Sequence, residues 1–265
     1  MKIAFIGGGV MGEIILSAIL DKGLSTPQAI SVSDIKKSRR QHLQKKYGVT
    51  VTDSNRLAAG GDVVVLAVKP QDLTTVMAEL NGQLKAGQLV LSIIAGARIN
   101  TLCLGLNHNQ VVRVMPNTPA QIGQGISVWT ATAEVSQEQK EQAGSILKAM
   151  GRELYVADEK YIDMATAVSG SGPAYIFLFI ESLVAAAVNI GLPADIAKEL
   201  VLETILGSGN LVQKSGKEPA RLRKMVTSPG GVTAEALNKL EKGGFAELVL
   251  EAVVAAYNKA RRLGD

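Results

Sequence analysis

Cysteine and histidine are almost absent from this chain of 265 residues, which has one cysteine, Cys103, and two histidines, His42 and His108. A single cysteine excludes a disulfide framework and is compatible with a reducing compartment. No cluster of histidine, cysteine and carboxylate residues has the spacing of metal ligands, so we expect no metal catalysis. His42 falls in a basic helix and His108 in a polar loop, and we expect both to be solvated surface residues.

Aromatic residues are few (4%), and neither charge is in large excess, since the net charge is +4. No basic block is interleaved with aromatic residues, which argues against a nucleic-acid binder, whereas a small positive excess suits an anionic cofactor and substrate. The N-terminus has no charged segment followed by a cleavage site, so we expect no secretory signal. The most apolar stretch, Ala174–Ile190, is interrupted by polar residues and is too short to span a bilayer. We therefore expect a cytoplasmic protein with no membrane or nucleic-acid partner.

The N-terminus carries a glycine pattern typical of dinucleotide binding. The apolar run Lys2–Ile6 precedes the glycines at positions 7, 8, 9 and 12, and helical apolar spacing follows over Val10–Lys22. In this context the first glycine makes the tight turn, Gly9 lets the backbone approach the pyrophosphate, and Gly12 lets helix and strand pack closely. Asp34 follows the next strand, about twenty residues farther on, where an acidic residue holds a ribose. The alternative is a structural glycine loop, but this context favours a dinucleotide.

Continuous apolar runs alternate with helical segments over the first part of the chain. The predicted strands are Lys2–Ile6, Ile30–Ser33, Val49–Val51, Asp62–Val68, Gln88–Ile93, Gln110–Met115, Gly125–Thr130 and Arg152–Val156. This alternation predicts a mostly parallel, doubly wound α/β sheet buried on both faces, over residues 1–158.

From residue 159 to residue 265 the pattern is helical only. The predicted helices are Glu159–Val168, Pro173–Ile190, Ala194–Lys214, Pro219–Val226, Ala234–Lys242 and Phe245–Leu263. Helix Ala174–Ile190 is apolar nearly all round, which predicts burial on every side. A region of about 105 residues cannot easily surround such a helix alone, so we expect an interlocked homodimer.

Three loops follow predicted strands on one edge of the sheet, where open α/β sheets bind ligands. They are Ala67–Pro70, Ile93–Gly96 and Met115–Pro119. One such loop is commonly a plain turn, but three on the edge that carries the glycines indicate a cofactor site. Lys69 is either a ligand contact or a solvated strand end. Ser169–Tyr175 is either a hinge into the apolar helix or a set of small residues that permits close helix packing.

The segment Thr227–Thr233 is a rigid turn between helices. Pro229 fixes its own φ, and the two glycines that follow can adopt positive φ and leave their N–H groups uncovered. Thr233 is predicted to N-cap the helix Ala234–Lys242. Since a helix N-terminus with uncovered N–H groups is an anion site, the segment is predicted to receive a small carboxylate beneath one hydroxyl. A plain Pro-Gly loop with a cap is the alternative.

These motifs together resemble those of pyrroline-5-carboxylate reductases, from Met1 to the C-terminus. The resemblance rests on Gly7–Gly12, Val68–Pro70, Asn117–Pro119, Ser169–Tyr175 and Thr227–Thr233, in this order. It implies a Rossmann domain followed by an all-helical dimerisation domain, with dimers that often assemble into decamers. The implied reaction is the NADPH- or NADH-dependent reduction of 1-pyrroline-5-carboxylate, a cyclic imino acid, to L-proline, the last step of proline biosynthesis.

The resemblance also assigns roles to residues. The implied cofactor contacts are Ile6, Gly7, Gly8, Gly9, Val10, Met11, Gly12, Asp34, Lys36, Asn55, Ala67, Val68, Lys69, Pro70, Ile93, Ile94, Ala95 and Asn117. The implied substrate contacts are Glu159, Ser228, Gly230, Gly231, Val232 and Thr233. Thr233 is the implied catalytic residue, because its hydroxyl can accept from the protonated ring nitrogen and donate to the product amine.

Two departures from the family pattern are visible. Lys224 stands where an acidic residue is usual, and Asp34 stands where many members have a small polar residue. Asp34 favours a free ribose, whereas Lys36, Lys37 and Arg39 can neutralise a 2′-phosphate, so we expect both cofactors to work.

Rival readings share parts of this pattern. They are a reductase of a related imine, a β-hydroxyacid dehydrogenase, and a non-catalytic nucleotide-binding protein. A hydroxyacid enzyme would be expected to carry a basic catalytic side chain near Ser169–Tyr175, where this chain has none.

Overall fold

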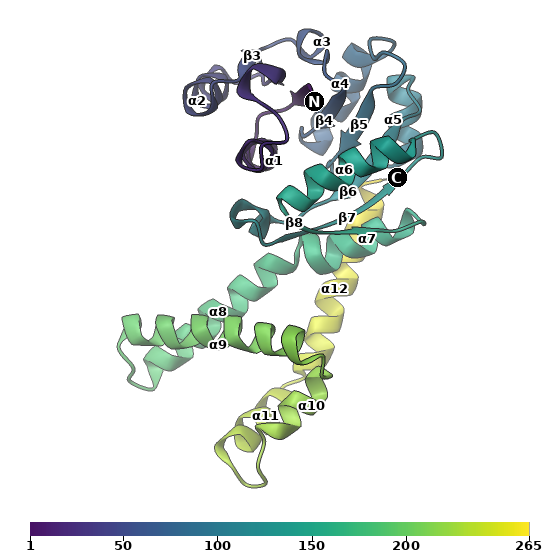
Figure 1. Ribbon diagram of the computed structural model, residues 1–265. Helices are drawn as coiled ribbons and strands as arrows, with labels where there is room; N and C mark the ends of the chain where they lie inside the picture. The colour runs from purple at the N-terminus through teal and green to yellow at the C-terminus, as the bar shows by residue number, and fades with distance from the viewer. Residues whose placement is uncertain (265) are drawn as a thin grey trace. The chain divides into compact units, whose positions relative to one another are not determined.

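The computed structural model describes residues 1–264, so residue 265, the end of the predicted helical domain, lies outside the described residues. The chain divides into two compact units (Figure 1): Met1–Pro173 with residues 255–264, and Ala174–Val254. Helix α7 (Lys160–Ala165) packs against strands of the first unit. The predicted boundary near residue 158 therefore stays a prediction.

The first unit is built on an eight-stranded sheet in the order β3-β2-β1-β4-β5-β6-β7-β8. The strands are β1 Ile3–Ile6, β2 Ile30–Ser33, β3 Thr50–Thr52, β4 Val63–Leu66, β5 Leu89–Ser92, β6 Val111–Met115, β7 Gly125–Ala131 and β8 Gly151–Tyr155. All neighbours pair in parallel except β6 and β7, which are antiparallel. This order, with helical crossovers in both directions from β1, confirms the predicted Rossmann-type sheet.

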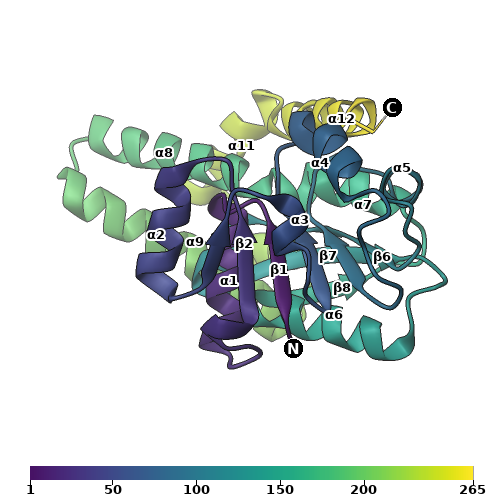
Figure 2. The same cartoon turned by 90° about the horizontal axis from the view of Figure 1, so that it is seen from above.

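Helices cover both faces of this sheet (Figure 2). On one face, α1 (Val10–Asp21), α2 (Lys37–Tyr47) and α6 (Gln137–Ala149) bury apolar residues against the strands. On the other face, the short helix α3 (Asn55–Ala58), α4 (Leu73–Leu80) and α5 (Ile99–Leu106) do the same. The strands are buried on both sides, which explains why they read as continuous apolar runs rather than as alternating ones.

The second unit is helical. It contains most of α8 (Gly172–Asn189), all of α9 (Ala194–Ser215), α10 (Pro219–Met225) and α11 (Val232–Lys242), and the start of α12 (Phe245–Arg262). The predicted all-helical second part is confirmed. Its apolar side chains are largely uncovered in the single chain: no residue of α8 is buried, and α9 buries only Ala197 and Val201.

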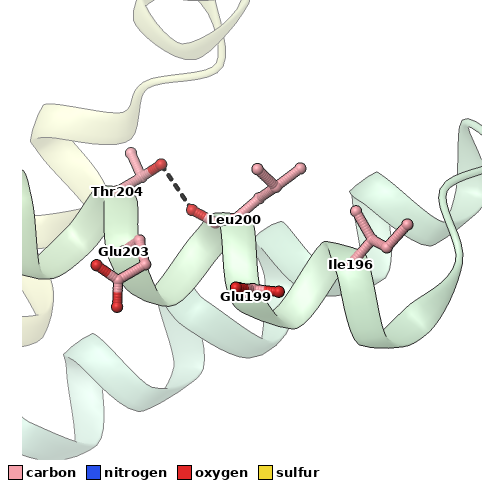
Figure 3. Close-up of a pocket in the computed structure, with 5 residues that line it drawn as sticks. All are labelled: Ile196, Glu199, Leu200, Glu203 and Thr204. Atoms are coloured by element: carbon pink, nitrogen blue, oxygen red, sulfur yellow. Dashed lines mark hydrogen bonds between the residues drawn. The ribbon is translucent and has the colours of Figure 1, made fainter.

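The outer face of α9 illustrates this exposure (Figure 3). Ile196 and Leu200 project beside Glu199, Glu203 and Thr204, and the Thr204 hydroxyl donates to the Leu200 carbonyl at 2.7 Å. Exposed leucine and isoleucine on one helix face are typical of a surface that another protein surface covers.

A π-helical segment, Thr166–Gly170, joins α7 to α8 without a break. The Ser171 N–H donates to the Thr166 carbonyl, five residues back, at 2.9 Å. The segment around Ser169, predicted to be either a hinge or a set of small residues that permits close helix packing, therefore contains a π-turn inside one helical run. Within the described residues, this run (Lys160–Asn189) is long and apolar enough to cross a membrane by length and composition alone, which corrects the expectation that the stretch is too short. Core helices of soluble proteins pass the same test.

Candidate functional site

The carboxyl ends of four neighbouring strands bring most of the predicted cofactor residues together. Ser33, Ile6, Leu66 and Ser92 stand in register across β2, β1, β4 and β5. The loops continue these pairings: the Gly7 N–H donates to the Ser33 carbonyl at 2.9 Å, and the Ala67 N–H to the Ile6 carbonyl at 2.8 Å. The loops that begin at residues 7, 34, 67 and 93 therefore open on one edge of the sheet.

The glycine loop has the shape that a pyrophosphate requires. A Cβ on Gly12 would lie 2.6 Å from the Gly7 carbonyl oxygen, so only glycine lets α1 pack this close to the loop. A Cβ on Gly9 would meet nothing within 4 Å, which leaves open space beside the start of the helix. Gly9 is the N-cap of α1 and supplies no side chain to the N–H groups of the first turn. The loop therefore fits a dinucleotide phosphate.

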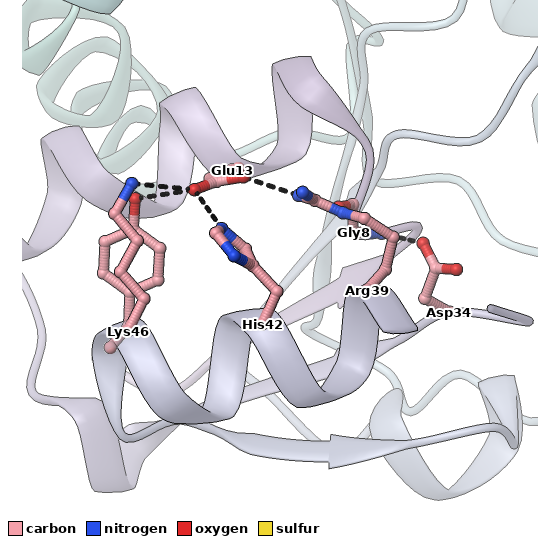
Figure 4. Close-up of polar contacts among 7 residues, drawn as sticks. Gly8, Glu13, Asp34, Arg39, His42 and Lys46 are labelled. Carbon is pink, nitrogen blue, oxygen red and sulfur yellow. Dashed lines mark hydrogen bonds and ion pairs between the residues drawn. The ribbon is translucent and has the colours of Figure 1, made fainter. Parts of the chain in front are cut away.

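The corner that the sequence predicts to hold the adenosine ribose, formed by Gly8, Asp34 and Arg39, is an organised set of charges (Figure 4). The Asp34 carboxylate accepts from the Gly8 N–H at 2.9 Å and from the Lys36 N–H at 2.8 Å. Arg39 donates to the Gly8 carbonyl oxygen through both Nε (2.8 Å) and Nη2 (2.6 Å). Gly8 is thus held at its N–H by a carboxylate acceptor and at its carbonyl oxygen by a guanidinium donor.

Glu13, on α1, anchors α2 beside this corner. Its carboxylate accepts from Arg39 at 2.6 Å, from Lys46 and the Tyr47 hydroxyl at 3.0 Å, and contacts His42 Nε2 at 2.9 Å. Burial alone would raise the pKa of Glu13, but the hydrogen bonds with His42, Arg39, Lys46 and Tyr47 outweigh it and lower the pKa to about 2. The spacing of Arg39, His42 and Lys46 on one helix face was visible in the sequence, but their common partner was not.

The other predicted cofactor residues differ in their burial and in the hydrogen bonds that they already make. Ile6 and Ile94 are buried in the core, so only their backbone can face a ligand. The Asn55 amide bridges the Ser33 hydroxyl and Glu79, and the Asn117 amide bridges the Ser169 carbonyl and the Ile126 N–H. Lys69 is exposed at the N-cap of a short 3-10 turn. This position is compatible with both hypotheses, a ligand contact and a solvated strand end.

The turn before α11 differs from its predicted form in one respect. Helix α11 begins at Val232 with Gly231 as its N-cap, so Thr233 is its second residue and the predicted N-cap role of Thr233 is wrong. The physical reason is that the extended Gly231 already accepts the first helical hydrogen bond, from Glu235 at 3.2 Å. Gly230 has φ +68°, as a left-handed turn requires.

This geometry decides which amides remain for an anion. The Gly231 N–H donates to the Ser228 carbonyl at 3.1 Å and is used within the turn. The N–H groups of Val232, Thr233 and Ala234 precede the first helical hydrogen bond and have no intrahelical acceptor, and no side chain caps α11. A Cβ at Gly231 would lie 2.5 Å from the Ser228 hydroxyl, which explains the glycine there.

Glu159, a predicted substrate contact, belongs to a cluster of ion pairs around the buried Arg113 in the first unit, and its own side chain is partly exposed. Its Oε1 accepts from Arg113 Nη1 and from the Ile99 N–H, both at 2.8 Å. Arg113 also pairs with Asp163 at 2.6 Å. Sequence reasoning missed Arg113 and Asp163, because their partners lie far away along the chain.

The two histidines differ. His108 is buried, with its Nε2 2.7 Å from the Gln88 carbonyl oxygen, so the expectation that it is a solvated surface residue is wrong. His42 is exposed on α2, as expected, and its Nε2 contacts Glu13. Among residues 1–264, no group of three or more histidine, cysteine and acidic residues is placed to hold a metal ion.

Comparison with known proteins gives consistent results. Residues 159–263 match a family described as pyrroline-5-carboxylate reductase dimerisation, and residues 2–96 match one described as NADP oxidoreductase, coenzyme F420-dependent. The pyrroline-5-carboxylate reductases of Synechocystis sp. and Pseudomonas aeruginosa are both 41% identical to this chain; the matches cover 100% of it and 98% and 97% of those proteins.

A solved structure agrees over the same extent. The pyrroline carboxylate reductase of Plasmodium falciparum, crystallised with NADP bound, is 34% identical with a TM-score of 0.92, and the match covers 100% of this chain and 98% of that one. Identity at this level along the whole length places the chain in the pyrroline-5-carboxylate reductase family.

Proposed function

We propose that this protein reduces 1-pyrroline-5-carboxylate to L-proline with NADPH or NADH, in the last step of proline biosynthesis. The observation that carries the proposal is the uncapped N-terminus of α11, in a chain whose α1 also begins with an uncovered glycine loop. The N-terminus of α11 suits a small carboxylate, and the N-terminus of α1 suits a dinucleotide pyrophosphate. Membership of the pyrroline-5-carboxylate reductase family supports this combination of ligands.

The chain's own residues would divide the work as follows. The Val232 and Thr233 N–H groups would hold the substrate carboxylate at the start of α11, with Ser228 and Gly230 shaping the turn around it. The Thr233 hydroxyl would accept a hydrogen bond from the protonated ring nitrogen. Protonation makes the imine carbon electrophilic, and the bound nicotinamide supplies the hydride. The protein's contribution is mainly alignment, which can lower a barrier by about 7–11 kcal/mol.

Self-association is the expected quaternary state, because residues 159–263 match a dimerisation family. We propose a homodimer through the exposed apolar residues of α8, with dimers that assemble into a decamer. A second copy would cover side chains that the single chain leaves uncovered, so these residues need no membrane. We also propose a cytoplasmic location. We propose, further, that the boundary between the dinucleotide-binding domain and the helical domain lies near residue 158.

The test is an assay for nicotinamide oxidation with pyrroline-5-carboxylate, run with NADH and NADPH in parallel. We expect turnover that depends on both the imine and the nucleotide. A six-membered cyclic imino acid serves as the matched control for a related imine. Nucleotide binding without turnover of either imine would contradict the proposal and favour a non-catalytic protein.

A further inference from the structure

The corner at Gly8 also bears on which dinucleotide the protein prefers, an inference that rests on the proposed function. A 2′-phosphate on the adenosine ribose needs an available cation, whereas a free 2′-hydroxyl needs an acceptor. Asp34 is such an acceptor, and the Gly8 and Lys36 N–H groups hold its carboxylate in place. A phosphate dianion beside this fixed carboxylate would be repelled.

Both arginines of this corner already hold other partners, which limits how far they can offset that repulsion. Arg39 gives Nε and Nη2 to the Gly8 carbonyl and pairs with Glu13. Arg40 donates to the Asp34 and Ile35 carbonyls and pairs with Asp53 at 3.4 Å. The cationic side chains that remain at the start of α2 are Lys36 and Lys37, which are exposed, so water and salt weaken their attraction for a phosphate.

We propose that this chain selects the dinucleotide with an unphosphorylated ribose, NADH, and that Glu13 contributes to the selection by holding Arg39 on the glycine loop. Asp34 is then the direct determinant. Glu13 and Arg39 are positioning residues: Figure 4 shows Glu13 between Arg39 on one side and His42 and Lys46 on the other. Arg39 shapes the Gly8 peptide for either dinucleotide and does not read the 2′-position.

The experiment measures dissociation constants of NADH and NADPH by nucleotide fluorescence on the full chain, without substrate. We expect the wild-type protein to bind NADH at least about tenfold more tightly. Asp34→Ser should reduce that ratio by about tenfold or more. Asp21→Asn removes one negative charge farther along α1 and serves as the matched control, which should leave the ratio unchanged.

Variants of Arg39 and Glu13 distinguish a positioning role from direct recognition of the 2′-phosphate. Arg39→Gln should weaken both dinucleotides by similar factors, because both need the Gly8 loop. Glu13→Gln should shift the ratio several-fold towards NADPH, and the double variant Glu13→Gln/Arg39→Gln should remove that shift. Thermal unfolding of each variant shows whether it is folded, and Asp34→Ser and Arg39→Gln carry the test if Glu13→Gln is not.

Three results would overturn the inference while leaving the proposed function intact. They are equal or tighter binding of NADPH by the wild type, an unchanged ratio in Asp34→Ser, and a loss of NADPH binding alone in Arg39→Gln. Failure of the wild-type protein to bind either dinucleotide would instead overturn the proposed function and this inference with it.

Discussion

The guanidinium of Arg113 on β6 pairs with the carboxylate of Glu159 at the start of α7, with 2.8 Å between Nη1 and Oε1. The Arg113 side chain is only 2% exposed, and Asp163 neutralises its other end. Charge in such a place persists only when it is paired. The cluster therefore fixes α7 on the sheet, and Glu159 has a structural role whether or not it also touches substrate.

Two conservative substitutions separate these roles. Glu159→Gln and Asp163→Asn each remove one negative partner of Arg113, so both should lower the midpoint of thermal unfolding. We expect Glu159→Gln also to raise KM for the imine several-fold, whereas Asp163→Asn leaves KM near the wild-type value. Equal KM values in the two variants would show that Glu159 is structural only.

The depressed pKa of Glu13 predicts an acid-sensitive contribution to stability. Because its pKa is about 2 in the folded chain, below its ordinary value of 4.5, the stabilisation is present above about pH 4.5 and is lost as pH falls towards 2. After allowance for solvent screening we expect about 1–2 kcal/mol. Denaturant unfolding of wild type and Glu13→Gln should differ by this amount at about pH 6 and much less at about pH 3. A difference that does not change with pH would contradict the assignment.

The two helix-proximal glycines of the loop should respond differently to alanine. Gly12→Ala places a methyl 2.6 Å from the Gly7 carbonyl oxygen, so it should lower both thermal stability and dinucleotide affinity. Gly9→Ala meets nothing within 4 Å and keeps a negative φ, so the chain should fold as before. Its methyl would occupy the space predicted for the pyrophosphate, so affinity should fall by about tenfold or more. Tight binding by Gly9→Ala would place the pyrophosphate elsewhere.

The apolar surface of α8 predicts that charge there disrupts self-association. Leu178 is 64% exposed in the single chain, so Leu178→Glu costs little within one copy but would bury an unpaired charge between two. We expect a smaller particle by light scattering or loss of the protein to aggregation. Leu57→Glu, at a residue 79% exposed on the first unit, is the control and should keep the wild-type mass. A Leu178→Glu protein of wild-type mass would contradict an interface at this face.

Sequence patterns predicted the repeating parts of this fold and missed those that depend on distant partners. Continuous apolar runs located the strands of the sheet, because burial on both faces leaves that signature. The single turn α3 was missed, since four residues are too few for a periodic signal. The burial of His108 and Arg113 depends on partners 20 and 46 residues away, which local composition cannot reveal.

At the candidate site, too, the sequence predicted local features better than contacts between distant residues. The glycine loop and the Thr227–Thr233 turn were predicted because glycine and proline have local conformational meaning. The start of α11 was placed two residues late, because the choice between Gly231 and Thr233 as N-cap depends on backbone angles rather than on residue type. The bonds of Arg39 with Gly8 and Glu13 join separate elements and leave no local mark.

The position of Thr233 makes a substitution there a direct test of the chemistry. Because Thr233 is an exposed residue inside the first turn of α11 and caps nothing, Thr233→Ala should change the free energy of unfolding by no more than about 0.5 kcal/mol. If its hydroxyl bonds the ring nitrogen in the transition state, the same change should lower kcat/KM for the imine by about tenfold or more, and Thr233→Ser should restore most of it.

Thr227→Ala is the matched control, since it removes a hydroxyl from the same turn that is already engaged with the Arg223 carbonyl at 2.6 Å. Its kcat/KM should stay near that of the wild type. Dinucleotide affinity should stay unchanged in all three variants, because the pyrophosphate is assigned to the loop before α1. A Thr233→Ala enzyme with full kcat/KM would leave the α11 terminus as a carboxylate site without a catalytic hydroxyl, and protonation of the imine would then have to depend on solvent or on the substrate's own carboxylate.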